Sequence, residues 1–76
     1  MLISRSNLAE FPWMVSEPWS PWTVECWDWC MDTWGPAGKT WQQDCEQVLL
    51  DTEQHYHVFW RFSEYQQAVQ FVLVWG

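Results

Sequence analysis

The sequence predicts a single α+β domain over residues 1–76, with a four-stranded antiparallel sheet that carries two helices on one face. Residues 55–62 alternate between apolar and polar side chains, at the period of a strand. A helix start signal at Ser20-Pro21 and a stop signal at Gly35-Pro36 enclose an amphipathic segment. Strand-like and helix-like segments then follow one another in the order strand, helix, strand, strand, helix, strand.

The N-terminal half is predicted to hold one strand and one helix. Residues 11–16 form the strand, because they are rich in aromatic and β-branched side chains, and residues 17–21 form a turn. Ser20 is a natural N-cap, and the helix is expected to run to Trp34. Its predicted buried seam consists of Thr23, Trp27, Cys30 and Trp34.

The C-terminal half is predicted to begin with a hairpin after a loop at residues 36–39. Residues 40–51 alternate as a half-exposed strand, residues 51–54 form the turn, and residues 55–62 form the second strand. In that second strand one side consists of Tyr56, Val58, Trp60 and Phe62, and the other consists of His55, His57, Phe59 and Arg61.

A second helix and a last strand are predicted to close the chain. Ser63 is the expected helix cap, with Gln66 at the capping-box position, and residues 71–75 are expected to form the strand. The resulting order, βαββαβ, is that of a ferredoxin-like domain.

The composition disfavours several classes of partner. Ten acidic residues against three basic ones give a formal net charge of −7. Nucleic acids and anionic membranes are disfavoured, because both are bound mainly through Lys and Arg. Proteins with basic clefts, including those that handle nucleic acids, are favoured. We expect a cytoplasmic protein, because residues 1–10 lack the apolar core of a secretory signal and no segment is long enough to span a bilayer.

Nine tryptophans in 76 residues indicate a protein-binding surface. A core of this size cannot bury nine indoles, and exposed Trp is enriched in interface hot spots. The candidate site combines two indoles that share one flank of the first helix with the acidic stripe beside them; its residues are Trp22, Trp29, Glu25, Asp28 and Asp32. Alternatively, both indoles lean over the sheet edge and the acids form a solvated face.

The sheet face without helices is a second candidate surface. Phe59 is expected to be exposed there beside His57 and Arg61. Aromatic residues on this face stack on bases in RNA-recognition domains, but the negative charge opposes that use here. A protein contact, or a homodimer contact, is the preferred interpretation.

Cysteine and histidine supply the ligand types for a zinc site, whose candidate residues are Cys26, Cys30, Cys45, His55 and His57. The spacing lacks the Cys-x2-Cys knuckle of structural zinc sites, so no metal or other cofactor is predicted. Reduced thiols buried in the core are the simpler interpretation of the cysteines at 26 and 30.

No catalytic constellation is predicted. No cysteine is flanked in sequence by a histidine or a cation that would activate its thiol, and the carboxylates lie on an exposed stripe. Residues 35–40 end in Gly-Lys-Thr but follow a helix, whereas a phosphate-binding loop follows a strand. We therefore expect a binding protein and not an enzyme.

The acids also suggest a nucleic-acid mimic, which presents carboxylates where a partner expects phosphates. The residues of that display would be Glu17, Glu25, Asp28, Asp32, Asp44, Glu46, Asp51 and Glu53. Their number is modest for such a role, and the aromatic signal competes with it.

The C-terminal segment contains Val58-Phe59-Trp60-Arg61-Phe62-Ser63, followed by Ala68, Phe71, Leu73 and Trp75-Gly76. In these residues it resembles the endings of small accessory proteins of tailed bacteriophages. The resemblance implies a viral accessory protein, a class that includes inhibitors of host and anti-defence proteins, and it carries over no functional residue.

The predicted function is therefore stoichiometric binding to a host protein with a basic surface, which is thereby blocked. Two alternatives stay open from the sequence: a self-assembling subunit of a homo-oligomer or virion, and a small zinc-binding domain.

Overall fold

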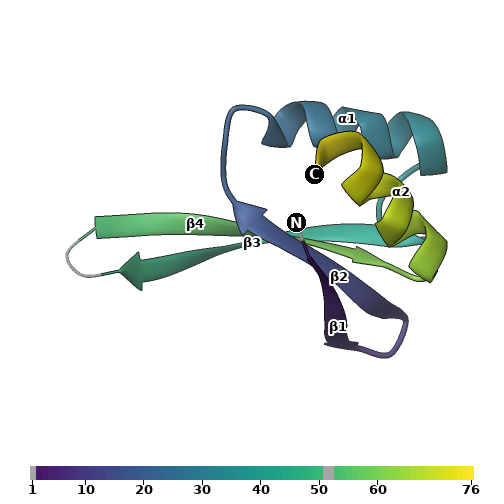
Figure 1. Ribbon diagram of the computed structural model, residues 1–76, viewed down its shortest axis with the longest axis horizontal. Helices are drawn as coiled ribbons and strands as arrows, with labels where there is room; N and C mark the ends of the chain where they lie inside the picture. Colours follow the sequence, from purple (N-terminus) through teal and green to yellow (C-terminus); the bar gives the residue numbers. More distant parts are fainter. Residues whose placement is uncertain (1, 51–52) are drawn as a thin grey trace.

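The computed structural model describes residues 2–50 and 53–76. Its elements follow in the order ββαββα: β1 (Ile3–Leu8), β2 (Phe11–Pro18), α1 (Thr23–Trp34), β3 (Trp41–Leu50), β4 (Glu53–Phe62) and α2 (Tyr65–Trp75). The strands form one antiparallel sheet in the order β1-β2-β4-β3, and both helices cover the same face of it (Figure 1). The α+β class and the four-stranded antiparallel sheet are confirmed, whereas the ferredoxin-like order βαββαβ is wrong.

The first strand was not predicted from the sequence. β1 pairs with β2 from Ile3↔Val15 to Leu8↔Phe11, with a register irregularity between Arg5 and Leu8. Its sequence, Ile-Ser-Arg-Ser-Asn-Leu, is apolar only at its two ends, so it lacks the alternation that marks a half-buried strand. β1 forms one edge of the sheet, beside β2, and is the fourth strand in place of the predicted strand at residues 71–75.

The C-terminal segment 71–75 is helical, and the prediction of a strand there is wrong. α2 runs without interruption from Tyr65 to Trp75 and buries Gln67, Ala68 and Phe71, which share one face at helical spacing. The valines of this segment favour a strand by intrinsic propensity. Burial of Ala68 and Phe71 against the sheet outweighs that preference, because propensities are weak compared with tertiary packing.

The N-terminal cap of α2 also differs from the prediction. The N-cap is Glu64 and not Ser63, and its capping-box partner is Gln67 and not Gln66. The Gln67 side chain accepts a hydrogen bond from the Glu64 backbone N–H (3.1 Å) and donates one to Thr40 Oγ1 (3.1 Å). The buried amide of Gln67 therefore links the start of α2 to the start of β3.

The first helix begins two residues after the predicted position. Ser20 forms a turn instead of an N-cap: its carbonyl oxygen accepts from the Thr23 N–H (3.0 Å) and its Oγ accepts from the Trp22 N–H (3.3 Å). The predicted end at Trp34 is confirmed, since Gly35 follows with a φ of +84°, a left-handed conformation that favours glycine.

The core lies between the helices and the sheet and is largely aromatic. Trp41, Trp60, Phe62 and Phe71 are fully buried, together with Val15 and Val58 of the sheet. Both buried indoles have hydrogen-bond acceptors, since Trp41 Nε1 donates to the Gly35 carbonyl (2.8 Å) and Trp60 Nε1 donates to Glu17 Oε1 (3.1 Å).

The two helices divide the sheet between them. α2 contacts β1, β2 and β4. α1 covers the part of the same face that lies over β3, where Trp27 packs edge-on against Trp41 (4.9 Å between ring centroids). Of the helices in the described residues, none has the length and hydropathy needed to cross a bilayer.

The β3–β4 hairpin extends beyond the helices as an arm (Figure 1). Its register runs without a shift from Trp41↔Phe62 to Leu50↔Glu53. Two of the four residues of the predicted turn, Asp51 and Thr52, lie outside the described residues, and the other two belong to β4. The remaining bounds of β3 and β4 match the predicted strands to within a few residues.

Candidate protein-binding surface

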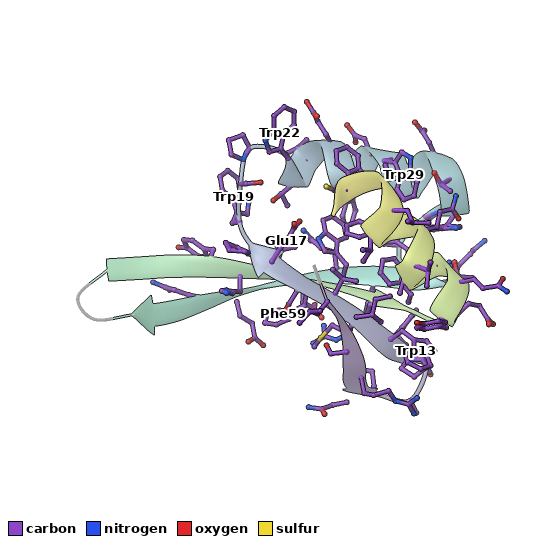
Figure 2. The ribbon with its side chains drawn as sticks, in the orientation of Figure 1. Trp13, Glu17, Trp19, Trp22, Trp29 and Phe59 are labelled. Atoms are coloured by element: carbon purple, nitrogen blue, oxygen red, sulfur yellow. The ribbon has the colours of Figure 1, made fainter. Side chains whose placement is uncertain are left out.

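Trp19 and Trp22 are the exposed indoles of this protein. Their side chains are 52% and 62% exposed, whereas the other seven tryptophans are half-buried or buried. Both lie in the connection between β2 and α1, and Figure 2 shows them at the end of α1 that faces the arm. The two exposed tryptophans therefore lie on one short segment.

This segment is held against the sheet by backbone hydrogen bonds. The Trp19 N–H donates to the carbonyl oxygen of Tyr56 (2.8 Å), which extends the β2–β4 pairing one residue past Pro18↔His57. The Ser20 turn then leads directly into α1. Pro18 and Pro21 restrict the backbone on either side of Trp19. The indole therefore projects from a backbone of limited freedom.

Two apolar hollows of about 380 Å³ each meet at Trp19. One is lined by Trp19, Cys45 and Tyr56, and the other by Trp19, Thr23, Val24, Trp27 and Gln43. We refer to the two together as the Trp19 groove. Tyr56 and Val24 are themselves exposed, at 51% and 61%, so the groove combines large apolar side chains from the connection, α1 and the arm.

The structure separates the two indoles that the sequence analysis placed together. Trp22 is exposed, but Trp29 is half-buried beside the core. The Trp29 ring makes edge contacts with Trp34 (5.0 Å between centroids), and with Phe71 and Trp75 of α2 (6.3 Å each). A partner can therefore reach Trp22 directly, whereas Trp29 holds α1 against α2.

The three acids of α1 are exposed along the side of the helix away from the sheet. Glu25, Asp28 and Asp32 follow the predicted spacing, and none of them forms an ion pair with another described residue. The same helix carries Val24 and Trp27 of the Trp19 groove. The α1 helix therefore carries two residues of the groove and, on its outer side, three exposed acids.

The candidate residues on the other sheet face contact one another. Phe59 lies on the face opposite the helices (Figure 2), but it is half-buried, and the Arg61 guanidinium lies 5.6 Å from its ring centroid. Arg61 also forms an ion pair with Asp44, and its Nε donates to Ser6 Oγ (3.2 Å). His57 lies 6.4 Å from the Phe59 ring. Phe59, His57 and Arg61 are therefore all half-buried, whereas Trp19 and Tyr56 of the Trp19 groove are exposed.

The candidate metal ligands are not brought together in the described part of the chain. Cys26 and Cys30 are buried in the core, Cys45 is exposed in the Trp19 groove, and His57 lies on the opposite sheet face. The His55 side chain lies outside the described residues. No group of three or more potential ligands occurs among the described residues.

Burial determines the protonation state of the two core thiols, Cys26 and Cys30. Burial, with the nearby carboxylates of Glu17 and Glu25, raises the pKa of Cys26 to about 12. Burial and the neighbouring Cys26 raise the pKa of Cys30 to about 12. Both thiols are therefore protonated at neutral pH, and neither has the thiolate character of an activated nucleophile.

The acids proposed as a phosphate-like display lie on different sides of the protein. Glu25, Asp28 and Asp32 lie on the outer side of α1, whereas Asp44 and Glu46 lie on the sheet face away from the helices. Glu17 accepts the Trp60 indole N–H, and Asp51 lies outside the described residues. The acids of this set whose side chains the structure describes therefore lie on more than one side of the protein.

No protein-family model, curated protein or solved structure that was compared with this chain matches it. Similarity to characterised proteins therefore assigns no function, and the resemblance of the C-terminal residues to phage proteins stays a prediction.

Proposed function

We propose that this chain is a protein-binding module whose contact surface is the Trp19 groove with Trp22. The carrying observation is that Trp19 and Tyr56, both at least half exposed, line the Trp19 groove, and that the exposed Trp22 lies in the same β2–α1 connection as Trp19. Large aromatic side chains that fill or border pockets supply most of the binding free energy of protein interfaces. A surface of this kind on a small domain is a typical sign of a protein contact.

The charge of the chain supports a basic partner. The net charge is −7, and the exposed acids Glu25, Asp28 and Asp32 of α1 have no ion-pair partners among the described residues. Negative charge around an apolar contact steers a positively charged partner and repels nucleic acids. As in the function predicted from the sequence, the proposed partner is a host protein with a basic surface, and this chain inhibits it by occupying that surface.

Site-specific photocrosslinking tests this proposal. Tyr56 in the groove and Tyr65 on α2 are equally exposed, at 51% and 50%, so each is replaced in turn by the photoreactive analogue p-benzoylphenylalanine. We expect a bacterial protein to crosslink at position 56 and not at position 65. An excess of unlabelled wild-type protein should compete for this crosslink, whereas an excess of the Trp19→Ala variant should not.

A matched control comes from Leu73, which is 80% exposed on α2. The Leu73→Ala variant should compete as well as the wild-type protein, since its side chain lies away from the groove. Equal crosslinking at positions 56 and 65, competition by Trp19→Ala, or no crosslink at position 56 would contradict the proposal.

A further inference from the structure

The outer edge of β3 is an uninterrupted strand edge. β3 ends the sheet, and its register with β4 shows no shift over its ten residues. It contains neither proline nor lysine, the residues that commonly protect an edge from further pairing. The opposite edge differs, because β1 has a register irregularity between Arg5 and Leu8 and carries a basic side chain.

The hydrogen-bond pattern identifies which groups of β3 face outward. The Ser63 N–H donates to the Thr40 carbonyl oxygen (2.8 Å), directly before the pair Trp41↔Phe62. Because antiparallel pairing alternates, every second residue from Thr40 onward directs its N–H and C=O toward β4, and the residues between direct theirs to the open edge. Among the β3 residues whose side chains are described, those whose backbone groups face the open edge are Trp41, Gln43, Cys45 and Gln47.

Most of these outward groups are available for pairing. The Trp41 carbonyl oxygen accepts from the Gly38 N–H (2.7 Å), which confirms its outward direction. The backbone groups of Gln43, Cys45 and Gln47 have no hydrogen-bond partner among the described residues. An extended segment laid along this edge would pair with these three residues as a fifth strand.

The surfaces on the two sides of this edge differ in chemistry. Gln43 and Cys45 line the Trp19 groove, so the residues of an added strand that lie opposite them would point toward Trp27 and the groove. The intervening residues would point to the other face, beside Asp44 and Glu46, which are both exposed. Asp44 already pairs with Arg61, whereas Glu46 has no ion-pair partner among the described residues.

A second copy of this chain fits the edge poorly. An antiparallel self-pairing centred on Cys45 places Asp44 opposite Glu46 of the second copy, and one centred on Asp44 places the two Asp44 side chains opposite each other. Like charges directly opposite each other destabilise strand pairing. The net charge of −7 on each copy adds to the repulsion.

We propose that the β3 edge binds an extended, positively charged segment of the partner by strand addition, with basic side chains facing Asp44 and Glu46 and apolar side chains facing the Trp19 groove. This inference rests on the proposed function, since it specifies the partner segment that the groove receives. Backbone pairing provides affinity, and the alternating chemistry of the two faces provides specificity.

A defined peptide tests this mode of binding. The probe is a capped octapeptide in which Val-Lys is repeated four times; the controls are a Val-Glu repeat and a peptide of four valines followed by four lysines. We expect the Val-Lys repeat to bind at least about tenfold more tightly than either control, by titration calorimetry. Hydrogen exchange measured by NMR should slow at the amides of Gln43, Cys45 and Gln47, and not at those of β1.

Two variants separate backbone pairing from side-chain contact. Cys45→Pro removes an outward N–H without removing a bond to β4, so we expect it to weaken binding of the Val-Lys repeat about tenfold. Cys45→Ala keeps the N–H and should bind within about twofold of the wild type. Glu46→Lys preserves the backbone and reverses the charge, and it should also weaken binding of this peptide.

The outcomes distinguish this inference from the proposed function. Strand addition would be overturned if the Val-Lys repeat did not bind, if the three amides were not protected, or if Cys45→Pro bound with wild-type affinity. It would also be overturned if protection grew with protein concentration in the absence of peptide, because that result would indicate self-pairing. In each case the proposed function still stands if crosslinking at position 56 is competed by the wild type and not by Trp19→Ala. If Trp19→Ala competes, the proposed function fails whatever the peptide does.

Discussion

Nε1 of Trp60 donates a hydrogen bond of 3.1 Å to Oε1 of Glu17, which joins β4 to β2 on the helix-covered side of the sheet. Trp60 is fully buried, so its indole N–H has no access to water as an alternative acceptor. The half-buried carboxylate of Glu17 (Figure 2) therefore belongs to the core and is not a free surface charge.

Removing this acceptor is expected to destabilise the protein. Glu17→Ala leaves a buried N–H without a partner, which costs about 1–3 kcal/mol in the free energy of unfolding. Glu17→Gln retains an acceptor oxygen and should lose less than half of that amount. Urea unfolding of both variants measures the difference, and equal stability of the two variants would show that the hydrogen bond contributes little.

The two indoles of the sequence-based site are expected to respond differently to truncation. Trp29→Ala removes contacts with Trp34, Phe71 and Trp75, and we expect a loss of about 2 kcal/mol, below the roughly 3–5 kcal/mol typical of a fully buried Trp. Trp22→Ala, at an exposed position, should change stability by less than about 0.5 kcal/mol. Thermal unfolding followed by circular dichroism separates the two cases; similar melting temperatures would contradict the packing of Trp29.

The core thiols are expected to reduce stability at alkaline pH. In the unfolded chain a thiol loses its proton near pH 9.0, whereas burial, aided by Glu17, raises the pKa of Cys26 to about 12, and burial also raises that of Cys30 to about 12. The folded state therefore holds protons that the unfolded state has released between pH 9 and pH 12. The contribution of each thiol is complete below pH 9 and falls by up to about 1.4 kcal/mol per pH unit above it.

The Cys30→Ala variant isolates the effect of thiol titration on stability, because lysine and tyrosine titrate in the variant as they do in the wild type. The free energy of unfolding, measured from pH 7 to pH 11, should decline less steeply in the variant than in the wild type. Parallel curves would contradict the assignment of the alkaline loss to the thiols.

Thiol labelling should distinguish Cys45 from the other two cysteines. Cys45 is exposed in the Trp19 groove, whereas Cys26 and Cys30 are buried and carry raised pKa values. A thiol reagent such as 5,5′-dithiobis(2-nitrobenzoate) at pH 8 is expected to modify one thiol rapidly in the folded protein and all three in denaturant. The Cys45→Ala variant should lose the rapid phase, and a rapid phase that persists in it would place a second thiol at the surface.

Much of the fold could be predicted from local signals. The glycine stop of α1, the alternation of β4 and the half-exposed pattern of β3 each depend on the residues of one element, and all three are present in the structure. β1 was missed because an edge strand with apolar residues only at its ends has no clear periodicity. Residues 71–75 were assigned to a strand because their β-branched composition hid the helical spacing of Ala68 and Phe71.

The error at the C-terminus also explains the difference at the candidate site. With a strand at residues 71–75, nothing would cover the flank of α1 on which Trp29 lies. With a helix there, Phe71 and Trp75 pack against Trp29. The exposure of Trp29 was therefore decided by an element distant in sequence, which local patterns do not report.

The principal residue of the groove was also missed. Trp19 is predicted as part of a turn, although an indole between Pro18 and Pro21 in a short connection has little freedom to fold back into a core. The two prolines that flank Trp19 were therefore the sequence signal that could have predicted its exposure. The contributions of Tyr56 and Cys45 were not visible from the sequence, because they depend on how far the arm extends past α1.

The arm separates the residues that stabilise the fold from those that meet a partner. Core positions of the hairpin, such as Trp41 and Phe62, are buried and pair with each other, whereas Cys45 and Tyr56, nearer to the tip of the hairpin, are exposed. Substitutions in the outer part therefore leave the packing around Trp41 intact. Selection for a new partner can act on the outer arm over many generations without first having to restore a damaged core.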